Sequence, residues 1–196
     1  MRFTPALRRF TYTTHVTTSV GWLGAAVVFL ALAAIGLMSQ DERTVRGAYL
    51  VMAPAAWLVL VPLAHASLLS GIALSLGTPW GLFRHYWVIL KLVITAFSTI
   101  VLLVYMSTFR QMTAVAADPV VELGLVRNPS PLVHAVLALV LLVTATVLAV
   151  YKPFGPVADV DRGKVRRWAY LVAAAIAVLA ISLLLLTHLI GGSFRH

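Results

Sequence analysis

The residues THVTTSVGWLGAAVVFLALAAIGLM, from Thr14 to Met38, contain no Asp, Glu, Lys or Arg in 25 consecutive positions. An α-helix needs roughly 20 apolar residues to cross the ~30 Å hydrocarbon core of a bilayer. This stretch is therefore predicted to be a membrane-spanning helix. The basic segment MRFTPALRRF precedes it, but the apolar run is too long for a signal-peptide core, and we interpret it as a retained first span.

The composition of the whole chain agrees with this prediction. Of the 196 residues, 61% are hydrophobic and 11% are charged, whereas a soluble domain is about 25% charged. The length leaves room for a single domain, residues 1–196. Because the basic residues lie at the ends of apolar runs, we assign the net charge of +9 to loops that face lipid headgroups and not to nucleic-acid binding. The absence of cysteine excludes disulfides, thiolate metal sites and iron–sulfur clusters.

Five apolar runs are long enough to span a membrane, and the connections between them carry glycines, prolines and charges. The second run is too long for an upright helix and contains Pro54 and Pro62, so we expect it to be kinked or tilted, or to end near Gly71. The predicted fold is all-α, a polytopic bundle of five transmembrane helices. The predicted spans are residues 14–38, 48–76, 86–109, 132–151 and 168–190.

The basic residues predict the orientation, because the cytoplasmic loops of membrane proteins carry an excess of Lys and Arg. With the N-terminus cytoplasmic and the C-terminus outside, ten basic residues fall inside and five fall outside. The inner residues are Arg2, Arg8, Arg9, Arg84, Lys91, Lys152, Arg162, Lys164, Arg166 and Arg167, and the outer residues are Arg43, Arg46, Arg110, Arg127 and Arg195. The Ala-, Val-, Leu- and Arg-rich usage is typical of a high-GC bacterium, which predicts a multi-pass protein of the bacterial cytoplasmic (inner) membrane.

All six acidic residues fall in predicted loops, which disfavours a transporter that moves protons or cations along intramembrane carboxylates. Histidine is the side chain that remains for chemistry within the spans. His134 lies three residues after Pro131, and His188 lies three residues before Gly191. Antiparallel neighbouring helices would hold these two imidazoles at similar depth, near the outer side.

A second histidine layer is predicted near the inner side, from His15 and His65, and His85 could replace either of them. Two neutral imidazoles that face each other are what a six-coordinate haem iron requires, and a helix bundle offers the apolar interior that suits haem. The pattern predicts one or two haem b groups, bound by His134 with His188 and by His15 with His65. The alternative for each histidine is a hydrogen bond to a neighbouring helix.

The stretch GTPWGLFRHYWVILK, residues 77–91, concentrates polarity between two apolar runs. Arg84 and Lys91 could neutralise haem propionates near the membrane surface, with Trp80, Tyr86 and Trp87 at the interface. The ordinary belt of aromatic and basic residues at a helix boundary explains this stretch equally simply, and for the stretch alone it is the favoured interpretation. Lys91 can also extend its amine back toward the headgroups.

Two segments, HVTTSVGWLGAAVVFLALAAIGL (15–37) and LAHASLLSGIALSLGTPWGLFRHYWVILKLVIT (63–95), carry a resemblance. Together they resemble a loose group of bacterial polytopic proteins. The group includes copper-resistance D-type membrane proteins, the haem-associated protoporphyrinogen oxidase of the HemJ type, and related integral membrane proteins. The resemblance covers about half of the chain, with motifs of low specificity. It implies a helical bundle whose histidines hold haem or copper, with His15 and His65 as candidate ligands and Lys91 as a conspicuous polar residue.

The leading functional hypothesis is a membrane b-type cytochrome that transfers electrons, with quinol as the electron donor and quinone as a further cofactor. The second hypothesis is a non-catalytic accessory subunit of a larger membrane complex, in which the histidines only bridge helices. The third hypothesis, permeation of copper or a small solute, requires a polar track through the bundle, which the sequence does not reveal. The expected surroundings in every case are the lipid bilayer, with no nucleic-acid partner.

Overall fold

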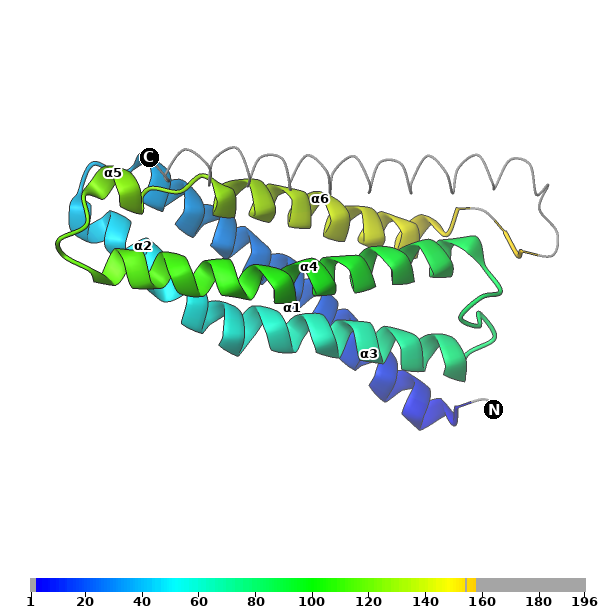
Figure 1. The fold of residues 1–196 in the computed structure, drawn as a ribbon. Coiled ribbons are helices and arrows are strands. Elements are labelled where there is room, and N and C mark those ends of the chain that lie inside the picture. Colours follow the sequence, from blue (N-terminus) through cyan, green and yellow to red (C-terminus); the bar gives the residue numbers. More distant parts are fainter. Residues whose placement is uncertain (1–2, 154, 158–196) are drawn as a thin grey trace.

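The computed structural model describes residues 3–153 and 155–157, and in these residues it is helical with short connections (Figure 1). The elements are α1 (Pro5–Met38), α2 (Glu42–Ala55), the π-helical segment η1 (Ala56–Leu60), α3 (Val61–Gly77), α4 (Tyr86–Ala117), α5 (Leu123–Val126) and α6 (Ser130–Tyr151).

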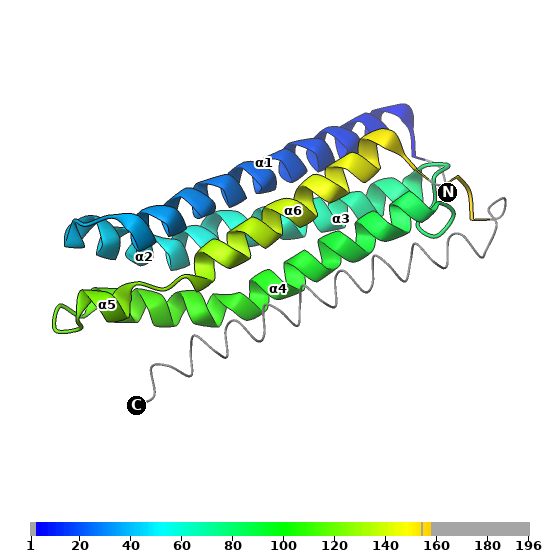
Figure 2. The ribbon, with the colours of Figure 1, turned by 90° about the horizontal axis from the view of Figure 1, so that it is seen from above.

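Four long antiparallel rods form a bundle, and α2, η1 and α3 together make the second rod (Figures 1 and 2). The first rod, α1, packs against α3 and α6, and α4 packs against the same two helices. Toward the other end α2 takes the place of α3 between α1 and α4. Helices α1 and α4 therefore stand at diagonally opposite corners of the bundle.

Four helical segments in the described residues are long and apolar enough to cross a membrane: Pro5–Met38, Glu42–Gly77, Tyr86–Ala117 and Leu123–Tyr151. The first four predicted spans are confirmed as such segments. The fifth predicted span, residues 168–190, lies outside the described residues, and so does His188.

Local capping moves the start of α1 to Pro5, well before the predicted start at Thr14. The Thr4 hydroxyl accepts a hydrogen bond from the backbone N–H of Leu7 at 3.3 Å. Proline is favoured at the first helical position because it has no N–H to leave unpaired there. Arg8 and Arg9 therefore lie on the first turns of α1 itself.

The second rod stays helical through both prolines. Pro54 lies inside α2, Pro62 lies in the first turn of α3, and the five residues between these helices form η1. Proline removes a backbone donor, and a local π segment is one way to pair the groups that are freed. The helix continues past Gly71 to Gly77, so the early end that we considered is not observed.

Aromatic rings pack among alanine and aliphatic side chains in the interior of the bundle, and the outward faces are apolar. Phe29 of α1 packs edge-on against Phe109 of α4 at 5.6 Å between ring centroids, and Tyr105 packs against Phe109 at 4.8 Å. Large apolar side chains remain exposed on the outward faces, as expected where lipid is the solvent. They include Val20, Val27, Val28, Leu103, Val104, Val140, Val143 and Val147.

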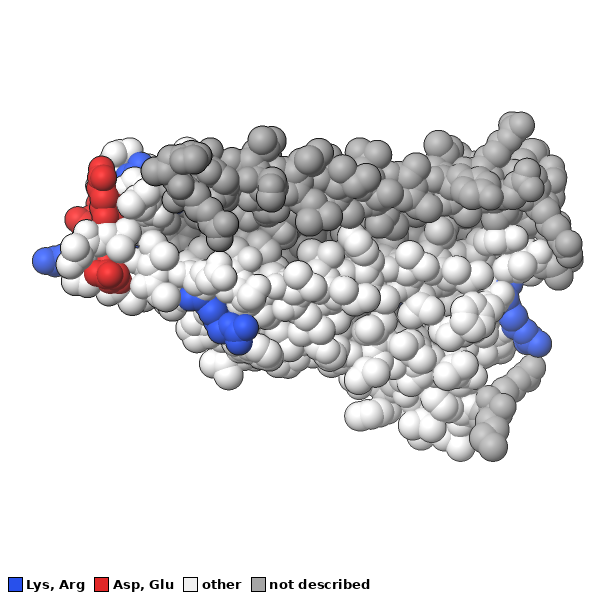
Figure 3. Space-filling model, viewed as in Figure 1, with Lys and Arg blue, Asp and Glu red and all other residues white. Residues whose placement is uncertain are grey.

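Carboxylates gather at one end of the bundle, which we call the acidic end (Figure 3). The four described acidic residues there are Asp41, Glu42, Asp118 and Glu122. Asp41 caps α2, because its carboxylate accepts hydrogen bonds from the Thr44 hydroxyl at 2.6 Å and the Thr44 N–H at 3.0 Å. These bonds hold the pKa of Asp41 below its usual value.

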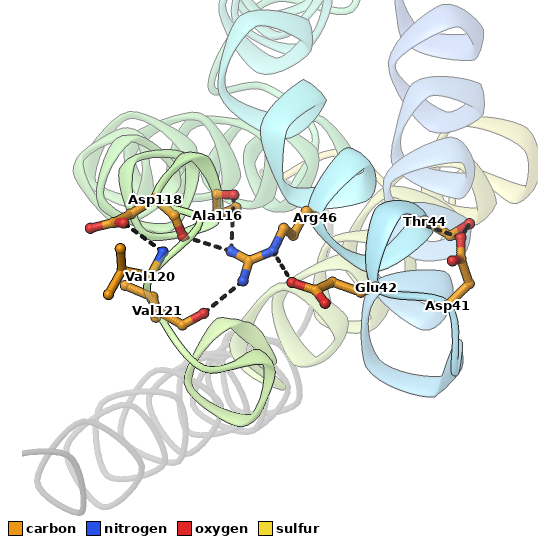
Figure 4. A network of polar contacts seen from close by, with 8 residues as sticks. All are labelled: Asp41, Glu42, Thr44, Arg46, Ala116, Asp118, Val120 and Val121. Carbon is orange, nitrogen blue, oxygen red and sulfur yellow. Dashed lines mark hydrogen bonds and ion pairs between the residues drawn. The ribbon is translucent and has the colours of Figure 1, made fainter.

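At the same end Arg46 ties α2 to the chain that follows α4 (Figure 4). Its guanidinium donates to the carbonyls of Ala116, Asp118 and Val121 at 3.4, 2.8 and 2.6 Å, and to the Glu42 carboxylate at 2.8 Å. A cation at the carboxyl end of a helix satisfies carbonyl groups that have no partner within the helix. This contact fixes the acidic end of the second and third rods.

Packing of α1 against α2 gives a first prediction. A Cβ at Gly36 would lie 3.0 Å from ring atoms of Tyr49. Tyr49 is fully buried, and its hydroxyl is held by the backbone of Asn128 at 2.9 and 3.0 Å, so the ring has no room to retreat. Overpacking of this kind costs about 1–3 kcal/mol, so Gly36→Ala should lower the thermal unfolding midpoint in detergent. Gly24→Ala, where a Cβ meets nothing within 4 Å, is the control, and equal midpoints for the two variants would contradict this packing.

Candidate functional site

The best-defined polar site in the described residues is centred on His15 of α1, which is 6% exposed. Its Nδ1 lies 3.1 Å from the carbonyl oxygen of Ser67 and 3.2 Å from the hydroxyl of Ser70, both on α3. Its Nε2 lies 2.8 Å from the amine of Lys91 on α4. A Cβ at Gly71 would lie 2.9 Å from the imidazole, so glycine is what lets the ring sit against α3.

The partners of His15 decide which ring nitrogen carries the proton. A carbonyl oxygen only accepts hydrogen bonds, so Nδ1 must donate to Ser67. In the neutral ring Nε2 is then the acceptor, and the Lys91 amine donates to it. The bond joins diagonally opposite helices through the interior of the bundle. Lys91 makes this one side-chain hydrogen bond among the described residues, although an ammonium has three N–H donors.

A cavity of about 760 Å³ lies beside the His15–Lys91 pair. It runs along α1 from Arg8 to Trp22, a length of roughly 21 Å at the helical rise of 1.5 Å per residue, and it reaches α3, α4 and α6. Its walls are mainly apolar. The hydroxyl-bearing residues that line it are Tyr12, Ser19, Ser67, Ser75, Thr78, Thr95 and Thr146. The Thr78 hydroxyl is buried and has no hydrogen-bond partner within the described structure.

The part of the cavity near the start of α1 is basic. Arg8 and Arg9 line it from the first turns of α1, and Lys152 lines it from the residue that ends α6. Lys152 adopts a left-handed backbone conformation, with φ 46° and ψ 49°, and its amine lies 4.9 Å from the centroid of the Trp80 ring. We call this the basic end. The four described carboxylates lie at the opposite end, whereas Asp159 and Asp161 are outside the described residues.

The stretch from Gly77 to Lys91 folds back on itself at the basic end. The carbonyl of Trp80 lies 2.7 Å from Nδ1 of His85, and the Trp80 ring packs edge-on against Trp87. The chain after α6 closes onto this loop, because the N–H of Val157 donates to the carbonyl of Arg84 at 2.9 Å. This backbone hydrogen bond, together with the Lys152 amine over the Trp80 ring, connects the loop before α4 to the end of α6. Arg84 itself is exposed and does not line the cavity.

The structure does not bring His15 and His65 together. Nδ1 of His65 lies 2.8 Å from the carbonyl of Val61 on its own helix. His65 precedes Ser67 by two residues, a rotation of roughly 200° around the helix. It therefore lies on a different face of α3 from the residues that contact His15.

His134 is half-buried near the start of α6. Its Nδ1 lies 2.8 Å from the Ser130 carbonyl, and its ring stacks on Tyr105 at 3.8 Å between centroids. The Tyr105 hydroxyl donates to the Ser130 hydroxyl at 2.8 Å. Because the predicted partner His188 is outside the described residues, the pairing of these two histidines stays a prediction.

The described residues contain no group of three or more His, Asp or Glu side chains that could hold a metal ion. Sequence reasoning had selected both His15 and Lys91 without pairing them. It missed Ser67 and Ser70 as partners of His15. Arg8, Arg9 and Lys152 were used only to predict the orientation in the membrane. Their positions at helix ends on one side of the bundle were the sequence signal that could have predicted a basic site there.

Comparison with known proteins adds no assignment: no protein-family model, no curated protein and no solved structure matches this chain.

The hydrogen bonds of His15 predict its tautomer. In protein labelled with ¹⁵N-histidine, the resonances of His15, assigned by their loss in His15→Gln, should show a proton on Nδ1 and an acceptor at Nε2, because the Ser67 carbonyl requires a donor. Lys91→Met should shift the Nε2 resonance of His15 and leave that of His134 unchanged. A proton found on Nε2 would contradict the Lys91–His15 hydrogen bond as described.

Proposed function

We propose that the chain is a multi-pass membrane protein that binds an acidic amphiphile, a molecule with an apolar body and an anionic head group. The head group binds at Lys91, and the apolar body fills the cavity between α1, α3, α4 and α6. The observation that carries this proposal is a lysine amine inside the bundle that faces a large cavity and has a neutral imidazole as its one described partner.

The charge of the site selects the head group. A buried ammonium is costly unless it is paired and its donors are satisfied. His15 takes one N–H of Lys91 and leaves two for a ligand. Carboxylate or phosphate oxygens accept stronger hydrogen bonds from an ammonium than neutral oxygens do. The unpartnered hydroxyl of Thr78 adds a further donor on the wall of the same cavity.

The walls and the size of the cavity suit the apolar body. Ligand pockets commonly enclose about 300–1,000 Å³ and place a few polar groups in an apolar lining, and this cavity of about 760 Å³ lies within that range. Arg8, Arg9 and Lys152 line the cavity at the basic end and would attract an anion from the membrane surface. In the proposed orientation, with the N-terminus inside, this end faces the anionic leaflet of the cytoplasmic membrane.

Matched lipids test the proposal. Purified protein should bind palmitate more tightly than hexadecanol, which has the same chain and no charge. Lys91→Met should weaken palmitate binding by about tenfold or more, equivalent to ~1.4 kcal/mol, and should change hexadecanol binding little. The measurement is equilibrium binding of radiolabelled lipid in detergent micelles.

Arg110→Met is the matched control, because this exposed cation lies on the same helix near the acidic end. It should bind palmitate like the unmodified protein. Equal binding of palmitate and hexadecanol, or palmitate binding that survives Lys91→Met, would contradict the proposed head-group site.

A second candidate function, electron transfer by a b-type cytochrome with quinol as donor, is favoured by His134. Its Nδ1 donates to the Ser130 carbonyl, which leaves Nε2 as the acceptor, the arrangement that metal-ligating histidines commonly show. Haem b between His134 and His188 would supply one-electron transfer. We base this candidate on the outer pair, because both ring nitrogens of His15 have protein partners and His65 lies on another face.

Absorption spectra decide the second candidate. If haem is bound, protein purified from cells supplied with haem precursor should show a Soret band, and His134→Ala and His188→Ala should each remove the same haem. His85→Ala, at the other end of the bundle, should keep it. A colourless protein, or unchanged spectra in both variants, would contradict haem binding by this pair.

A further inference from the structure

A stripe of polar side chains runs along the inward face of α4, and its members are buried except for Lys91, which is partly exposed. Lys91, Ser98 and Tyr105 are spaced by seven residues, which is close to two helical turns and keeps them on one face. Thr95 and Thr99 lie one turn after Lys91 and Thr95, respectively. Thr95, Ser98, Thr99 and Tyr105 are 7, 7, 4 and 6% exposed.

Ser98 distinguishes this stripe from ordinary hydroxyls in a membrane helix. The hydroxyls of Thr95 and Thr99 donate to the carbonyls of Lys91 and Thr95 at 2.9 and 2.8 Å, which is the usual way for a helix to satisfy such groups. The Ser98 hydroxyl is buried and has no partner among the described residues. A buried hydroxyl without a protein partner commonly marks a bound water.

Each end of the stripe meets a titratable histidine. At the basic end Lys91 bonds to His15, beside the cavity. At the acidic end the Tyr105 hydroxyl bonds to Ser130, whose hydroxyl lies 3.4 Å from Nδ1 of His134. Polar groups inside a membrane bundle commonly mark ion paths or proton relays. No acidic residue of the described chain lies along this stripe, and α3 contributes only hydroxyls, from Ser67 and Ser70, at the His15 end.

We infer that the α4 stripe is a proton path between His15–Lys91 and the Tyr105–Ser130–His134 cluster. The longest gap, from Thr99 to Tyr105, is six residues, or roughly 9 Å of helical rise. Three waters, each about 2.8 Å from the next, would span the roughly 10.5 Å of helical rise from the unpartnered hydroxyl of Ser98 to Tyr105. The chemical balance is simple: one proton is accepted at one end as one is released at the other, driven by a pH difference and without a redox partner.

The side chains of the stripe suit protons better than metal cations. The described part of the stripe offers hydroxyls and imidazoles but no carboxylates to replace the hydration shell of a metal ion. A proton can pass along hydroxyls and waters by exchange of hydrogen bonds. This transfer does not need a pore wide enough for a hydrated ion. The proton path does not require a ligand in the cavity.

Proton flux into proteoliposomes tests the path. Vesicles containing a trapped pH dye, with valinomycin and potassium to clamp the membrane potential, should lose an imposed pH difference faster when they contain the protein than when they contain none. Ser98→Val removes the hydroxyl and matches Ser98→Thr in side-chain volume, and it should return the rate to that of empty vesicles. Ser98→Thr should restore the flux, because it restores the hydroxyl.

Ser107→Val is the matched control, because Ser107 lies on the same helix with an exposed side chain bonded to the carbonyl of Val104. It should conduct like the unmodified protein. The path is refuted if the unmodified protein conducts no faster than empty vesicles, or if Ser98→Val conducts equally fast. Palmitate binding by Ser98→Val, measured in the same preparation, reports on the ligand site separately and should be unchanged.

Discussion

A lysine amine inside a lipid-embedded bundle needs a hydrogen-bond acceptor, and this requirement organises the basic half of the structure. Lys91 finds its acceptor in His15, 76 residues earlier in the chain. The imidazole can accept because the Ser67 carbonyl fixes its proton on the other nitrogen, and it fits against α3 because residue 71 is glycine. The two hydrogen bonds of the His15 ring, to Lys91 and to Ser67, thus join three of the four rods and form part of the wall of the cavity.

The basic side chains at the two ends of the bundle have different partners. At the acidic end the Arg46 guanidinium donates hydrogen bonds to one carboxylate and three carbonyls. Arg127 donates to the carbonyl of Ser39 at 2.7 Å. At the basic end, within the described residues, Arg8, Arg9 and Lys152 face a cavity with no carboxylate among its lining residues. Cations committed to backbone carbonyls hold a structure together, whereas cations around a cavity are free to attract an anion. The difference is why we place ligand binding at the basic end.

Much of the fold could be predicted from apolar runs, because span length depends on bilayer thickness and little else. The start of α1 was missed, since the basic residues before Thr14 looked like a loop and the cap at Thr4 is a weak local signal. The partners of the histidines could not be predicted in the same way. Depth follows from position along a span, but the face that a side chain presents depends on helix rotation. The positions of His15 and His65 along their spans predict that both lie near the same end of the bundle. In the structure, however, His65 contacts its own helix, and Lys91 is the residue that bonds to His15.

A double-mutant cycle between His15 and Lys91 is the most direct test of this account. The free energies of unfolding in mixed micelles would be compared for the unmodified protein, His15→Phe, Lys91→Met and the double variant. A hydrogen bond to a charged group contributes about 1.5–3 kcal/mol, so the account predicts that the two single losses are not additive and differ from the double loss by more than ~1 kcal/mol. Additive losses would show that the two side chains do not interact, and the central bond of the structure would be contradicted.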